Sequence, residues 1–240
     1  MNITTYGIIA GLSSLLSLGF VNLNLKSLLI LLFSIIISRK ICHGCDKTFN
    51  MVSFMPVFSI LTMTFYNCKE IYNIILAFSI FAAISRIGCL FAGCCTGKES
   101  KSILSLKYEG NYVININTNK KIIRVTPSII LEIFLQFLFV YIILKSNNPL
   151  LLFGILNASL ILASDYWRHG GRALDKNICV ISSAILILFS IISIFKCKKI
   201  IKPKIVFKLN IYKIILSLLL VVISSNNIIF ENLYNKQYLD

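Results

Sequence analysis

The sequence predicts an all-α membrane protein, a polytopic bundle of seven or eight transmembrane helices with a small extramembrane β-hairpin or loop cap. Two bulk properties predict this class: 57% of the 240 residues are hydrophobic and only 14% are charged. The mean hydropathy of +0.84 lies far above that of an ordinary soluble domain. In addition, eight separate apolar stretches follow one another along the chain, which is typical of repeated membrane crossing.

Each predicted helix corresponds to one apolar stretch. Several stretches are shorter than the about 20 residues that a perpendicular helix needs, so flanking polar residues must extend them or the chain must run partly re-entrant. The first stretch lacks the basic start and the cleavage site of a signal peptide, so we expect it to remain as a helix. We find no internal repeat or linker, and treat residues 1–240 as a single integral membrane domain. The stretches are residues 6–20, 27–38, 51–66, 74–91, 128–144, 150–163, 178–195 and 211–223.

One long polar interruption, residues 96–126, separates the fourth and fifth stretches. It contains two short β-rich runs, residues 112–117 and 122–125, on either side of a polar turn. This pattern predicts a hairpin outside the bilayer. The hairpin is either a cap over a lipid site or a solvated loop.

The net charge of +15 comes from 24 basic and 9 acidic residues. In a membrane chain such an excess indicates cytoplasmic loops and anionic lipid headgroups, so we expect no nucleic-acid partner and a location in the inner or plasma membrane. If each stretch crosses once, the basic clusters at 39–47, 98–124 and 168–176 share one side and the cluster at 196–208 lies opposite. In one arrangement the arginines serve a site on the outer face and the lysine tract 196–208 is the cytoplasmic anchor.

Arg86 lies near the end of an apolar stretch and is the first functional candidate. A guanidinium at membrane depth costs about 3 kcal/mol on insertion scales, so its presence indicates a function such as holding an anionic lipid group. The alternative is an interfacial arginine whose side chain reaches the headgroups. Small residues crowd the segment after it: Gly88, Gly93, Gly97, Cys89, Cys94 and Cys95.

Three segments carry a resemblance to a known family. Residues 86–98 resemble the signature of prolipoprotein diacylglyceryl transferases, in the cysteine-containing variant of some divergent members. Residues 126–132 are similar to the family's second block, His-Pro-Thr-Gln-Leu-Tyr-Glu, and residues 166–175 fall where the family has its late tyrosine and arginine motif. The order and spacing of the three blocks agree over about residues 70–195.

The resemblance implies a transfer of a diacylglyceryl group from phosphatidylglycerol to the cysteine thiol of a lipoprotein signal peptide. Arg86, with Arg168 and Arg172, would hold the phosphate, because a guanidinium binds it bidentately. The same positive charge would lower the pKa of the incoming thiol and stabilise the leaving phosphate. The base would be His43 or His169, the two side chains that titrate near neutrality.

The resemblance also implies a set of substrate-binding residues. The glycines would let the chain leave the helix and present backbone N–H groups to a phosphate, or they would serve close helix packing. Pro127 is expected to begin the next helix, and Glu132 inside it is expected to pair with Arg86, as a structural ion pair or to order the site. No metal or cofactor is expected. The set is Gly88, Cys89, Gly93, Cys94, Gly97, Pro127, Ser128, Glu132 and Tyr166.

Two alternatives stay open. Cys89 stands where the family has asparagine and Thr126 where it has histidine, which favours a non-catalytic lipid-binding relative. The pairs Cys42/Cys45 and Cys94/Cys95 favour a membrane thiol–disulfide oxidoreductase, and would form a zinc site only if their loops meet. Bystander thiols, packed as small apolar residues, are expected for the others: Cys68, Cys179 and Cys197.

Overall fold

The computed structural model describes residues 5–21, 26, 29–30, 33–34, 36–37, 51–92, 97–109, 122–167, 176–197 and 206–236. This part of the chain is mostly helical and contains a two-stranded sheet, as the sequence predicts. The helices are α1 (Thr5–Leu18), α3 (Met51–Phe65), α4 (Cys68–Ala92), α6 (Ser128–Lys145), α7 (Pro149–Trp167), α8 (Lys176–Lys196) and α9 (Ile211–Lys236).

The helix bounds follow the apolar stretches, apart from the start of α4 and the ends of α7 and α9. Helix α6 begins at Ser128, as predicted, because Pro127 at its N-cap presets the backbone and needs no N–H partner. Helix α4 begins at Cys68 rather than at residue 74. The reason is a capping box: the Glu70 N–H donates to the Asn67 side-chain oxygen at 3.0 Å, and the Asn67 N–H donates to the Glu70 carboxylate at 3.3 Å. Helix α9 also continues well past residue 223.

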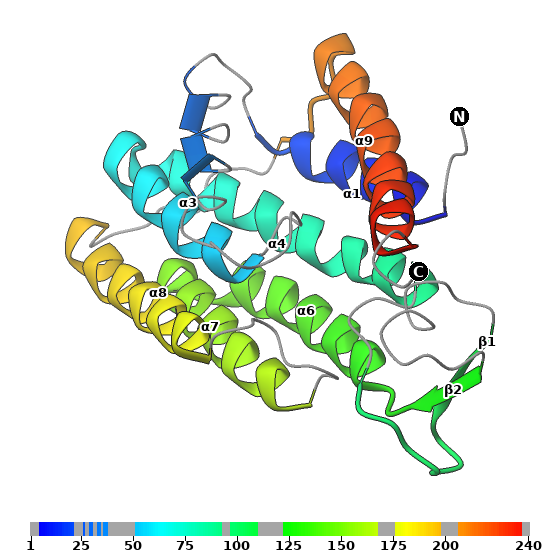
Figure 1. The fold of residues 1–240 in the computed structure, drawn as a ribbon. Helices are drawn as coiled ribbons and strands as arrows, with labels where there is room; N and C mark the ends of the chain where they lie inside the picture. Colours follow the sequence, from blue (N-terminus) through cyan, green and yellow to red (C-terminus); the bar gives the residue numbers. More distant parts are fainter. Residues whose placement is uncertain are drawn as a thin grey trace.

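Helix α4 lies in the middle of the bundle (Figure 1). Helices α1 and α9 pack together, and α1 also packs on α4. Helix α6 packs on α4 and α7, and α8 packs on α7 and α3. Aromatic rings join these helices in the core: the Phe153 ring lies 6.1 Å from that of Phe78 on α4 and 6.4 Å from that of Phe189 on α8, both edge-to-face.

Helices α1 and α9 meet through small residues. A Cβ added at Gly7 would collide with Ser225, and one added at Gly11 would collide with Val221. The Ser217 hydroxyl approaches that of Ser14 at 3.5 Å one turn further on. Such close backbone approach is typical of helix packing in membranes, where there is little hydrophobic driving force between helices.

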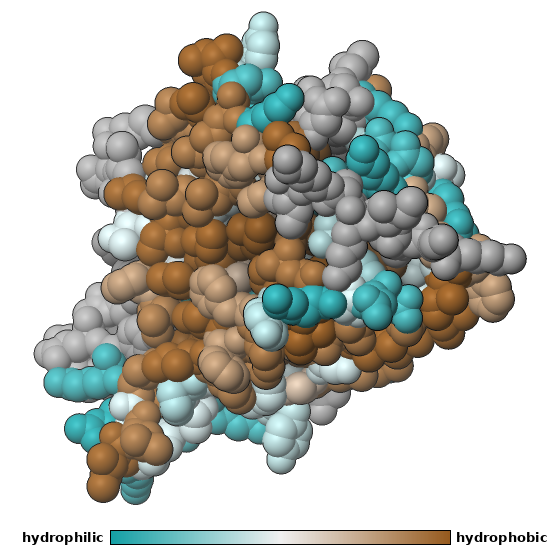
Figure 2. Space-filling model, turned by 180° about the vertical axis from the view of Figure 1, so that it is seen from behind, coloured by the Kyte–Doolittle hydropathy of each residue, from teal (hydrophilic) through white to brown (hydrophobic). Residues whose placement is uncertain are grey.

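The surface of the helices is apolar. Three helical segments are long and apolar enough to cross a membrane: Cys68–Phe91, Ser128–Lys145 and Cys179–Lys196. Four shorter apolar helical segments accompany them in the described part of the chain. Hydrophobic residues cover much of the face opposite the view of Figure 1, and hydrophilic residues gather toward its borders (Figure 2). Half of the predicted second stretch, 27–38, is described, and those residues (29–30, 33–34 and 36–37) are helical as predicted.

A β-hairpin lies beside the first turns of α6 (Figure 1). Strand β1 (Leu106–Glu109) pairs antiparallel with β2 (Ile122–Val125). The second predicted β-rich run is therefore confirmed as a strand, and its described partner is residues 106–109. The first predicted run, residues 112–117, lies outside the described residues.

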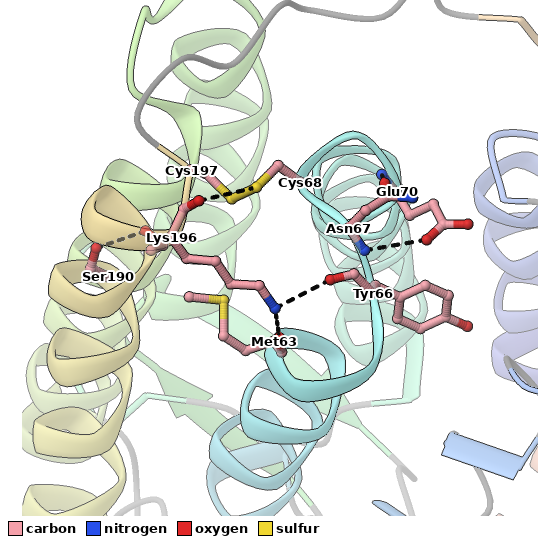
Figure 3. The surroundings of a disulfide bond; sticks show 9 residues. Met63, Tyr66, Asn67, Cys68, Glu70, Ser190, Lys196 and Cys197 are labelled. Carbon is pink, nitrogen blue, oxygen red and sulfur yellow. Dashed lines mark hydrogen bonds between the residues drawn. A yellow bond between two sulfur atoms is a disulfide. The ribbon is translucent and has the colours of Figure 1, made fainter.

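A disulfide joins Cys68 at the start of α4 to Cys197 just after α8, with their Cα atoms 5.7 Å apart (Figure 3). The expectation that these two cysteines are bystander thiols was wrong. The antiparallel arrangement of the helices brings together residues 129 positions apart, which spacing along the chain does not reveal. Cys179 is a buried thiol, as expected.

Candidate functional site

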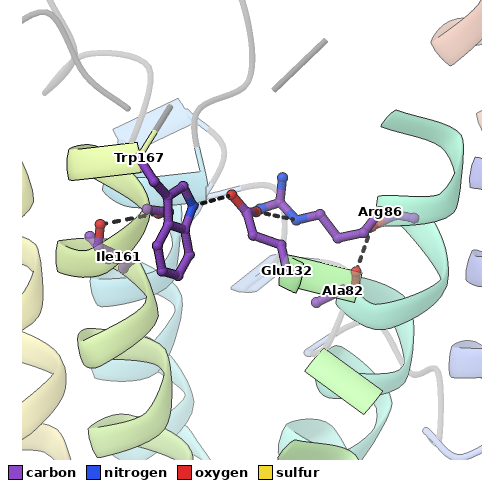
Figure 4. Close-up of polar contacts among 7 residues, drawn as sticks. Ala82, Arg86, Glu132, Ile161 and Trp167 are labelled. Atoms are coloured by element: carbon purple, nitrogen blue, oxygen red, sulfur yellow. Dashed lines mark hydrogen bonds and ion pairs between the residues drawn. The ribbon is translucent and has the colours of Figure 1, made fainter. Parts of the chain in front are cut away.

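The three segments of the family resemblance meet at the carboxylate of Glu132 (Figure 4). From α4, the Arg86 Nε lies 3.5 Å from the Glu132 Oε2. From the end of α7, the Trp167 indole N–H donates to the Glu132 Oε1 at 3.2 Å. The predicted pairing of Glu132 with Arg86 is thus confirmed, and one carboxylate links three helices.

The Arg86–Glu132 ion pair is buried, which raises its importance for stability. The Glu132 side chain is fully buried and that of Arg86 is 10% exposed. A buried carboxylate without a partner is strongly disfavoured, so the guanidinium and the indole N–H together stabilise it in this position. Glu132 reaches this position because it lies on the inward face of α6, which carries Ile129, Glu132, Gln136, Phe139 and Ile143.

Gly97 allows two backbone segments to approach closely beside α6. The Thr126 N–H donates to the Lys98 carbonyl at 2.8 Å, and the Ser100 N–H donates to the Arg124 carbonyl at 2.9 Å. A Cβ at Gly97 would lie only 2.6 Å from the Thr126 carbonyl oxygen and 2.8 Å from the Ser128 hydroxyl oxygen. Glycine is therefore required here for chain-to-chain packing, and this packing fixes the position of Lys98.

Pro127 and Ser128 form the start of α6 at the same end of the bundle. Pro127 is the N-cap residue and makes no side-chain capping bond. The Ser128 hydroxyl is buried and has no hydrogen-bond partner in the described part of the structure. This hydroxyl faces the backbone of Gly97, so it packs between the start of α6 and the segment that contains Gly97.

Tyr166 lies on the outside of the site. Its side chain is 79% exposed, and the Lys98 ammonium lies over its ring, 4.7 Å from the centroid. This geometry is a cation–π contact. Tyr166 directly precedes Trp167, so the end of α7 contacts both the Lys98 segment and the buried Arg86–Glu132 pair.

Gly88 and Cys89 lie within α4. The chain stays helical through Gly88 to Ala92, so of the two interpretations of this glycine an exit from the helix is wrong and close helix packing is supported. A Cβ at Gly88 would lie 3.0 Å from the Tyr6 ring, which shows close packing against α1. Cys89 is a buried thiol on the same helix.

The remaining candidates lie outside the described residues: His43, Gly93, Cys94, Arg168, His169 and Arg172, together with Cys42, Cys45 and Cys95. The late block therefore reaches the site through Tyr166 and Trp167. Among the described side chains, no group of three His, Cys, Asp or Glu residues is placed to hold a metal ion.

Two residues at the site had no assigned role in the sequence analysis. Trp167 is the single tryptophan of the chain and is the last residue of α7. Because a buried indole usually finds an acceptor for its N–H, a nearby carboxylate was a foreseeable partner. Lys98 closes the first block, and nothing in its sequence context pointed to an aromatic partner.

Comparisons with protein-family models, with curated proteins and with solved structures find no match for this chain.

Proposed function

We propose that this protein is a phospholipid-dependent transferase of the prolipoprotein diacylglyceryl transferase type, located in the inner or plasma membrane. It would move a diacylglyceryl group from phosphatidylglycerol to the cysteine thiol of a lipoprotein signal peptide. The observation that supports this proposal is the meeting of all three resembling segments at one buried ion pair, Arg86–Glu132 with Trp167.

The reaction needs a cation at the phosphate. The thiol sulfur forms a C–S bond to the glyceryl carbon as the C–O bond to the phosphate breaks, glycerol phosphate leaves, and the thiol proton passes to a base. Arg86 would bind the phosphate as negative charge develops on it. A guanidinium carries five N–H donors, more than one carboxylate needs, so contact with Glu132 is compatible with this role. His43 and His169 remain the candidate bases.

The reaction also needs apolar surface for two acyl chains. Helix α6 presents exposed hydrophobic side chains on the outward side of its first turns, at the level of the ion pair: Ile130, Leu131 and Phe134 are 46%, 44% and 63% exposed. Phe91, near the end of α4, is 60% exposed. Acyl chains lying along these side chains would bring a lipid headgroup to the end of the bundle that carries Arg86.

A second candidate is a lipid-binding relative without the chemistry. The observation that favours it is the charge balance at the site, because Glu132 already neutralises the guanidinium of Arg86. The replacement of the family's asparagine by Cys89 points the same way.

The test incubates the purified protein with labelled phosphatidylglycerol and a lipobox peptide, and detects the thioether product by mass. The transferase predicts product, and a loss of at least about 100-fold in the R86Q/E132Q double variant, which keeps the buried charge balanced. Lys101→Gln, an exposed lysine nearby, is the matched control and should not change the rate.

The other outcomes separate the alternatives. Retention of the lipid without thioether would contradict the transferase and favour the binding protein. A reversible change in thiol count at Cys42/Cys45 or Cys94/Cys95, without transfer, would favour an oxidoreductase.

A further inference from the structure

We infer that Lys98 is the residue that recognises the anionic phosphate headgroup at this site and distinguishes it from a zwitterionic one. The inference rests on the proposed lipid site and deepens it. It does not depend on the transfer step, because it concerns binding alone.

The buried ion pair does not by itself select an anionic headgroup. Arg86 and Glu132 form a buried pair whose net charge is zero. A neutral pair attracts an anionic and a zwitterionic headgroup to similar extents at long range. Selection for a net negative ligand therefore requires a further cation at this end of the bundle.

Lys98 is one such cation among the described residues; Arg168 and Arg172, the other candidates for the phosphate, lie outside them. The Lys98 side chain is exposed, and in the described part of the chain it makes no ion pair. Its ammonium instead lies over the Tyr166 ring. A contact with a ring face leaves the positive charge uncompensated, whereas a carboxylate would cancel it.

The position of Lys98 is fixed by backbone contacts. The Lys98 carbonyl accepts the Thr126 N–H, and Gly97 before it packs tightly against Thr126 and Ser128 at the start of α6. The side chain extends from this anchored segment to the end of α7, where Tyr166 is followed by Trp167, the partner of Glu132. Lys98 is therefore held at the end of α7, over a residue whose chain neighbour, Trp167, contacts the buried pair.

The aromatic ring places this cation at the depth of a headgroup. Tyrosines with an apolar ring and an exposed hydroxyl concentrate at membrane–water boundaries, and Tyr166 is 79% exposed at the end of an apolar helix. A phosphate at that level would meet the Lys98 ammonium, while the acyl chains extend along the helices.

The test uses the single tryptophan as a local reporter. In neutral detergent, Trp167 fluorescence is titrated with dihexanoyl phosphatidylglycerol, dihexanoyl phosphatidylcholine and glycerol 1-phosphate. We expect the wild type to bind the glycerol lipid more tightly than the choline lipid. Lys98→Gln should weaken the binding of dihexanoyl phosphatidylglycerol by about fivefold, the factor expected of one lysine beside an anionic headgroup. The affinity for dihexanoyl phosphatidylcholine should not change.

Matched variants separate recognition from general surface charge. Lys101→Gln removes an exposed lysine of the same segment and should leave all affinities unchanged. Lys98→Arg should restore the preference, because it keeps the charge and the ring contact. Tyr166→Phe should keep the preference and Tyr166→Leu should reduce it.

Three results would overturn the inference. The first is that the wild type and Lys98→Gln bind phosphatidylglycerol with equal affinity, and the second is that Lys98→Gln loses the same affinity for both lipids. The third is that Lys101→Gln loses as much affinity for phosphatidylglycerol as Lys98→Gln does. A Lys98-dependent response to glycerol 1-phosphate supports recognition of the phosphate group itself, and a response to the lipid alone supports recognition of the headgroup on its lipid. A protein that binds through Lys98 but forms no thioether would contradict the transferase and leave this inference standing.

Discussion

The two ends of the helix bundle use positive charge in different ways. We call the end formed by Tyr66, the start of α4 and the end of α8 the disulfide end, and the end formed by Arg86, Glu132 and Trp167 the ion-pair end. At the disulfide end, the Lys196 ammonium donates to the backbone carbonyls of Met63 and Tyr66 (Figure 3). At the ion-pair end, the Arg86 guanidinium faces a side-chain carboxylate.

The positive charge at the disulfide end has a structural role, whereas the arrangement at the ion-pair end is compatible with ligand binding. The last carbonyls of a helix lack intrahelical partners, and a lysine that donates to them also interacts favourably with the helix dipole. Lys196 thus completes the end of α3, next to the Cys68–Cys197 bond. At the ion-pair end the arginine pairs with the carboxylate of Glu132, and the exposed Lys98 and Tyr166 lie at the neighbouring end of α7.

The largest expected effect is the loss of the buried carboxylate at the ion-pair end. Glu132→Ala leaves the Arg86 guanidinium buried without its counter-charge, and should lower the free energy of unfolding by about 3–5 kcal/mol. Thermal or denaturant unfolding in detergent measures it. The R86M/E132A double variant should recover most of the loss. A double variant as unstable as the single one would contradict the role of charge pairing.

At the disulfide end, the corresponding change is Cys68→Ser with Cys197→Ser. Opening a cross-link between residues 129 positions apart should lower the free energy of unfolding by about 2–4 kcal/mol. Unfolding with and without a dithiol reductant measures it. The reductant should destabilise the wild type and have no effect on the double serine variant; equal sensitivity of both would show that another bond is responsible.

A smaller effect is expected from Lys196→Met, which removes the cation that caps α3 while keeping the apolar part of the side chain. The expected loss in unfolding free energy is about 1–2 kcal/mol. Lys145→Met is the matched control, because Lys145 is also an exposed lysine in the last turn of a helix, but among the described residues its ammonium contacts no backbone carbonyl. Equal losses in the two variants would mean that the carbonyl contacts of Lys196 contribute nothing.

The smallest expected effect comes from Trp167→Phe. This variant keeps an aromatic ring and removes the indole N–H that donates to Glu132, so stability should fall by about 1 kcal/mol. Denaturant unfolding followed by circular dichroism measures it, since the tryptophan signal is lost. The combination with Glu132→Gln should be less than additive, because both changes affect one hydrogen bond.

The comparison also shows which features the sequence could reveal. Apolar stretches located the helices because burial in lipid or core favours long hydrophobic runs, and Pro127 marked the start of α6. The pairing of Glu132 with Arg86 was predictable since a lone carboxylate in an apolar helix needs a cation. The start of α4 was missed, although the capping residues Asn67 and Glu70 stand three positions apart, as a capping box requires.

Other features depend on tertiary packing. Cys68 and Cys197 look like isolated small residues until antiparallel helices bring them together. Gly88 lies in a glycine-containing block that suggested a loop, but the approach of Tyr6 from α1 gives it a packing role. The contact of Lys98 with Tyr166 requires the hairpin segment to lie against the end of α7, and no local pattern encodes that position.

The Cys68–Cys197 bond has a consequence for how the chain lies across a bilayer. A disulfide persists in an oxidising compartment, whereas a reducing cytosol would open it. If these helices cross a membrane, a lasting bond assigns the end of α8, with Lys196, to the non-cytosolic side. Arg86 would then face the cytosol, the reverse of the orientation that the lysine tract suggests. A membrane-impermeant thiol reagent applied to intact cells and to lysed cells after reduction would read that orientation directly.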